Sequence, residues 1–219
     1  MTEAIGWNRY LDALIAELPV LARSIATQAH EHVRELLDDA AHIGSRQELL
    51  AMDRLLQTPT THFSDTLADA LRLQVVDGRR ESMRALNEPS PQDDARTALE
   101  LEQARTVGLV ESIAYWELRE LQGLCASLRR ARSIGPEQNP LRPQMCVRAL
   151  LIALEDAGFD EPTRITALRA AGSPLALVLR DFYVQQCRRL VRRDAAATTA
   201  SIPDRLDPAH RPGERRTPR

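Results

Sequence analysis

The stretch that decides the fold begins with Asn139-Pro-Leu-Arg-Pro143, continues as Gln-Met-Cys-Val-Arg-Ala-Leu-Leu-Ile-Ala-Leu-Glu-Asp-Ala, and ends at Gly158. Asn139 favours a turn through its side-chain amide, and Arg142 is held extended because it precedes a proline. Pro143 suits the first turn of a helix, where its missing N–H would be unpaired in any case. The apolar spacing that follows, and Gly158 before Phe159, predict a complete helix with one buried face. We expect this segment to fix geometry rather than to hold an active site.

Composition extends this expectation to the whole chain. The 219 residues are 43% hydrophobic, which is enough for one helical domain or two small ones with a core. Only 4% are aromatic, so the core must consist of Leu, Ala, Val and Ile. Because sandwiches and barrels favour aromatic and β-branched residues, this core suits helices better. The sequence therefore predicts an all-α, multi-helix bundle.

Apolar periodicity and helix-breaking residues divide the chain. We expect a helical half over residues 1–86, a linker over 87–94 with two prolines and no apolar residue, and a second helical half over 95–194. Pro19 and Pro174 are each expected to start a helix, and residues 95–132 are expected to form one long central helix. Residues 195–219 are rich in Arg and Pro without an apolar period, which predicts a disordered tail.

Charge is unevenly distributed and comes from a restricted set of residues. Residues 180–219 hold 10 Arg against 5 acidic residues, so the net charge of −2 leaves −7 for residues 1–179. All 29 basic residues are Arg. The absence of Lys excludes a Schiff-base enzyme, a phosphate-binding loop with its Lys, and a protein-kinase-type Lys.

No pattern of catalytic or metal-binding residues stands out. No Glu is followed three residues later by His, and His30 and His32 are two residues apart, which puts them on different faces of a helix. The three cysteines form no CxxC pair, and no Gly-x-Ser-x-Gly motif is present. We expect no catalytic residue, metal or cofactor, and cysteines that stay reduced in the core or at an interface.

The expected surroundings are the cytoplasm. No apolar run approaches the roughly 20 residues that span a bilayer, and no signal-peptide pattern begins the chain.

Two classes of function remain. The first is a non-catalytic interaction or regulatory protein that binds a protein partner or a second copy of itself, with Trp7 or Trp116 as an anchor. The second is nucleic-acid or anionic-surface binding through the last helix and tail, where phosphate contacts would come from Arg188, Arg189, Arg192 and Arg193. Arginines also suit the carboxyl end of a solvated helix, and the rest of the chain is acidic, so we favour the first class.

The opening stretch also carries a resemblance. Asn139–Pro143, then Cys146, Val147 and Ala149–Ala153, is similar to the "NPLxP…C.AF..AL" signature of the proteobacterial domain-of-unknown-function family 1631. Further similar positions are Arg79–Leu86, Asp93, Asp94, Arg164, Ile165 and Tyr183. The resemblance covers roughly residues 60–190 and corresponds to the amino-terminal helical part of longer members. It implies a helical fold and a bacterial signalling context, because longer members end in a small β domain reminiscent of PilZ proteins; it implies no activity for any residue.

Overall fold

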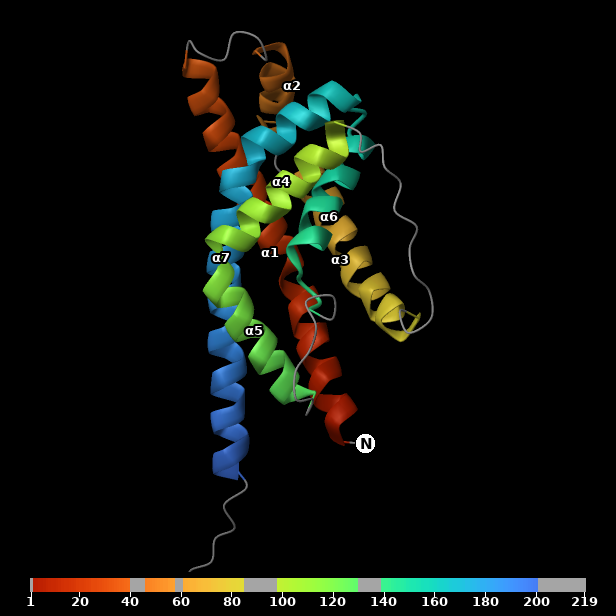
Figure 1. Ribbon diagram of the computed structural model, residues 1–219, viewed down its shortest axis with the longest axis vertical. Helices are drawn as coiled ribbons and strands as arrows, with labels where there is room; N and C mark the ends of the chain where they lie inside the picture. Colours follow the sequence, from red (N-terminus) through yellow and green to blue (C-terminus); the bar gives the residue numbers. More distant parts are fainter. Residues whose placement is uncertain (1, 40–45, 58–60, 85–97, 130–138, 201–219) are drawn as a thin grey trace, which may run out of the picture.

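A computed structural model describes residues 2–39, 46–57, 61–84, 98–129 and 139–200 (Figure 1). That part of the chain contains seven helices and no strand, so the all-α bundle is confirmed. The helices are α1 (Thr2–Asp38), α2 (Arg46–Gln57), α3 (Thr61–Arg84), α4 (Ala98–Ile113), α5 (Tyr115–Leu128), α6 (Pro143–Asp156) and α7 (Glu161–Ala200).

Helix α7 is the axis of the bundle. It packs against α4, α1 and α5, and α1 runs alongside it in the opposite direction (Figure 1). α3 lies between α1 and α6, while α2 covers one end of α1 and α7. The core is built mainly from Leu and Ala, as the composition predicts, and its residues come from both sequence halves; the buried leucines include Leu14, Leu18 and Leu21 of α1 and Leu175, Leu179 and Leu190 of α7.

Two expected helix starts are wrong, because Pro19 and Pro174 lie inside α1 and α7. A proline inside a helix costs about 3 kcal/mol, since it removes one hydrogen bond and crowds the preceding turn. Buried apolar residues on both sides of each proline, such as Leu18 and Leu21, offset that cost.

Helix α7 continues to Ala200, so residues 195–200, which we expected in the tail, are helical. Residues 201–219 and the expected linker 87–94 lie outside the described residues.

The expected single helix over residues 95–132 is also wrong. It is two helices, with a break at Ala114 (φ −105°, ψ 24°). The buried residues Glu102, Thr106, Val110, Ala114 and Leu118 follow one another at four-residue steps. Each such step overshoots a full turn by roughly 40°, so in a straight helix this stripe would rotate away from α7. The break realigns it and lets both helices contact α7.

The corner at Asn139 is confirmed atom by atom. Its side-chain Oδ1 accepts a 3.0 Å hydrogen bond from the Leu141 backbone N–H, and its carbonyl accepts one from Arg142. Arg142 is extended (φ −62°, ψ 145°) and Pro143 begins α6. At the other end of α6, Gly158 has φ +80° and the N–H of Phe159 bonds to the carbonyl of Leu154, as the Gly–Phe pair predicts.

Tyr183 ties this corner to α7. Its buried hydroxyl donates a 2.8 Å hydrogen bond to the Leu141 carbonyl, 42 residues away in the sequence. The corner and Tyr183 both belong to the residues that carry the family resemblance, and here they are in direct contact.

Asn139→Ala is expected to destabilise the protein by about 1–3 kcal/mol, because a buried backbone N–H loses its acceptor. Pro143→Ala is expected to cost less, since it only frees the first turn of α6. Urea unfolding of both variants measures the loss, with Arg148→Ala on the exposed side of α6 as the control. A wild-type free energy of unfolding for Asn139→Ala would contradict the structural role of the corner.

Candidate functional site

A groove between α5 and α7 contains two of the arginines that were expected to contact phosphate, Arg188 and Arg192. Its volume is about 330 Å³, and Glu120 of α5 faces Val184, Cys187, Arg188, Val191 and Arg192 of α7 across it. Trp116 precedes Glu120 by one helical turn and so lies on the same side of α5. We call Trp116, Glu120 and these α7 residues the α5–α7 face.

Trp116 is the most exposed large apolar side chain in the described part of the chain, at 75%. It stands in the first turn of α5, directly after the break at Ala114. Its ring meets Tyr115 edge-on at 5.1 Å, and the Arg119 guanidinium lies over Tyr115 and donates a 3.0 Å hydrogen bond to the Tyr115 hydroxyl. The neighbouring side chains thus support the indole without covering it.

The four expected phosphate-contacting arginines do not form one cluster. Arg188 and Arg192 are one turn apart and line the same groove. Arg189 is rotated by roughly 100° from Arg188 and forms an ion pair with Glu17 of α1. The side chain of Arg193 lies outside the described residues.

Trp7, the other expected anchor, occupies a different place. It is half-buried against the core and lies 5.5 Å from the Tyr10 ring. The Arg129 guanidinium covers its ring at 5.2 Å. Trp7 therefore lies near the carboxyl end of α5, with its faces engaged by the chain itself, whereas Trp116 is at the amino end.

The three cysteines are free and buried, so their expected position in the core is confirmed. Burial raises the pKa of Cys125, Cys146 and Cys187 to about 12. A thiol with that pKa is almost entirely protonated at neutral pH and is a poor nucleophile.

The histidines also face separate partners. His30 lies 3.0 Å from Asp53 of α2, and His32 lies 3.1 Å from Glu35 of its own helix. Within the described ranges, no group of three His, Cys, Asp or Glu side chains is placed to hold a metal ion. Nor is any helix in those ranges both long and apolar enough to cross a bilayer.

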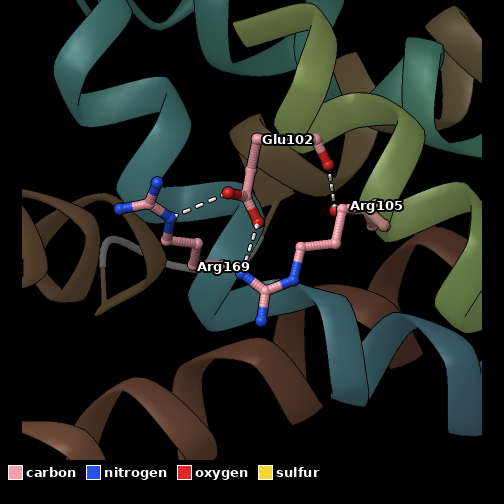
Figure 2. A network of polar contacts seen from close by, with 4 residues as sticks. Glu102, Arg105 and Arg169 are labelled. Carbon is pink, nitrogen blue, oxygen red and sulfur yellow. Dashed lines mark hydrogen bonds and ion pairs between the residues drawn. The ribbon is translucent and has the colours of Figure 1, made fainter. Parts of the chain in front are cut away.

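A polar cluster around Glu102 was not predicted from the sequence. Glu102 of α4 is buried, and its carboxylate is approached by two guanidinium groups, Arg169 of α7 at 2.8 Å and Arg105 at 3.8 Å (Figure 2). Its only sequence signal was an acidic residue on the apolar side of a helix. The partner that explains it is 67 residues away.

Comparisons with protein-family models, curated proteins and solved structures find no match to this chain. The groove and the polar cluster therefore have to be interpreted from their own geometry.

The buried thiols predict a loss of stability at alkaline pH. Cys125 and Cys146 stay protonated in the folded state up to a pKa of about 12, whereas the ordinary thiol value is 9.0. Above pH 9 the unfolded chain loses these thiol protons while the folded chain keeps them. The free energy of unfolding is therefore unaffected by the thiols below pH 9 and falls as the pH rises towards 12. Burial also raises the pKa of Tyr10 and Tyr183. Urea unfolding should give a smaller free energy of unfolding at pH 10.5 than at pH 7.5; equal values at matched ionic strength would contradict the burial of these groups.

Proposed function

We propose that this protein is a non-catalytic helical interaction protein that binds a partner protein through the α5–α7 face. The observation that carries the proposal is the exposed Trp116 beside a groove with an apolar lining. Tryptophan is the side chain most often found to dominate binding energy at protein interfaces, because it combines a large apolar area with little conformational freedom.

The charges around the groove indicate the chemistry of the partner. Val184, Cys187 and Val191 give the groove its apolar lining, and Arg188, Arg192 and Glu120 give it its charged lining. Val191 is half exposed, so an apolar side chain from a partner would remove it from water. A partner segment that presents an apolar ridge flanked by acidic residues fits this arrangement, as in helix-in-groove recognition.

The physiological context is proposed from the sequence resemblance. The similarity to family 1631 supports a regulatory role in bacterial signalling. A cytoplasmic location is part of the same proposal and rests on the sequence pattern alone. The protonated thiols are consistent with a role that needs no nucleophile.

The test compares the proteins that the immobilised wild-type chain and its variants retain from a lysate of the source organism, quantified by mass spectrometry. Trp116→Ala and Arg188→Glu, tested by affinity capture, should reduce retention of the same partner by about tenfold or more. Leu73→Ala on α3 is the matched control, because Leu73 is 57% exposed on a helix outside this face. Retention by Trp116→Ala at the wild-type level, or equal loss with Leu73→Ala, would refute the proposal.

A second candidate, binding of nucleic acid or another anionic surface, has one specific observation in its favour. Arg188 and Arg192 line the groove with Glu120, and the exposed Trp116 lies one turn before Glu120 on α5. Aromatic rings and arginines on one surface can stack bases and contact phosphates. Under this candidate, an electrophoretic shift with mixed DNA and RNA should appear at low salt and weaken steeply as salt rises.

The variants for this test separate the groove from the tail. Arg188→Ala with Arg192→Ala should abolish the shift, while removal of residues 201–219 should leave it. If no shift appears at low salt, this candidate function is eliminated. If the shift is lost only when residues 201–219 are removed, the tail and not the groove binds the nucleic acid.

A further inference from the structure

A pocket of about 220 Å³ lies between α4 and α7, around the Glu102 cluster. It is lined by Glu102, Arg105, Thr106, Leu109, Leu168, Arg169, Gly172 and Ser173. On α7 this pocket ends at Ser173, and the α5–α7 face begins at Val184. At 1.5 Å per residue the two sites are about 16 Å apart along the helix, so they are separate.

The cluster carries an excess of positive charge. One buried carboxylate, that of Glu102, meets the guanidinium groups of both Arg105 and Arg169. A single guanidinium would balance its charge. The second leaves a net charge of +1 at the pocket, which attracts an anion.

Hydrogen-bond donors also remain at this site. Arg169 binds Glu102 through Nε alone, and Arg105 does so through one terminal nitrogen (Figure 2). Each guanidinium has five N–H donors, and both side chains are more than half exposed. The Thr106 hydroxyl already donates to the Glu102 carbonyl, so the hydroxyl available as a further donor is that of Ser173.

Gly172 keeps space in the pocket at a cost to the helix. Glycine inside a helix is less stable than alanine by about 1 kcal/mol. A Cβ at this position would meet Leu109 at 3.5 Å and Thr106 at 3.8 Å, which are ordinary contact distances. Packing therefore does not require glycine here, whereas an open pocket benefits from it.

We propose that this pocket binds a phosphoryl group, either as free phosphate or as the end of a small phosphomonoester. A tetrahedral dianion can accept from two guanidinium groups at once, and the planar arginine fork can bind two phosphate oxygens together. Glu102 holds the two arginines in place and keeps them apart.

Isothermal titration of the full chain tests the site, with inorganic phosphate and glycerol phosphate as probes and sodium acetate at equal ionic strength as the blank. Wild-type protein should bind at least one of the two phosphate probes. Tighter binding of inorganic phosphate would identify free phosphate as the ligand, and tighter binding of glycerol phosphate would identify a phosphomonoester. Arg105→Ala should weaken binding about tenfold or more, because it removes a charge-assisted hydrogen bond. Arg72→Ala should leave binding unchanged, since Arg72 is a half-exposed arginine that also forms an i,i+3 ion pair, with Asp69 on α3, away from the pocket.

Gly172→Ala keeps the test independent of folding. It should raise the melting temperature and still weaken phosphate binding several-fold, since it stabilises α7 while it narrows the pocket. No binding of either probe at millimolar concentration, or unchanged binding in Arg105→Ala and Gly172→Ala, would overturn the proposal and leave the cluster as a structural contact between α4 and α7. Neither result bears on the α5–α7 face.

Discussion

Burial of α7 against several helices at once is the constraint on which the rest of the structure depends. Its apolar residues, such as Leu175, Leu179 and Leu190, are almost completely buried, and α4, α1 and α5 supply the surfaces that cover them. A helix this long presents different sides to different neighbours. The α5–α7 face and the Glu102 cluster therefore form where α7 meets α5 and α4, and they take arginines from two different stretches of that helix.

The sequence predicted correctly those features whose partners are close in the chain. The Asn139 turn, the start of α6 at Pro143 and its end at Gly158 depend on hydrogen bonds that span two to five residues. The continuity of α1 and α7 could not be predicted this way. The expectation that a proline starts a new helix considers only the hydrogen bond that proline removes. Whether the helix continues through the proline also depends on the apolar surface that it buries against helices far away in the sequence.

The residues of the candidate site could likewise be named from the sequence, but not their arrangement, which depends on contacts between distant helices. Trp116 was proposed as an anchor because tryptophan often dominates the binding energy of interfaces, but the break at Ala114 just before it could not be predicted, since no Gly or Pro marks that position. Arg188, Arg189 and Arg192 looked like one cluster in the sequence. Neighbouring helices separate them, because Glu17 of α1 engages Arg189 and leaves the other two in the α5 groove.

The Glu102 cluster and the α5–α7 face are connected through the break at Ala114. Glu102 and Arg169 join α4 to α7, and α5 departs from the end of α4 at Ala114. Across the break, Ala114 still donates to the Val110 carbonyl and accepts from the Leu118 N–H, so the two helices stay joined by hydrogen bonds. The position of α5 is therefore set by its own contacts with α7 and by those of α4.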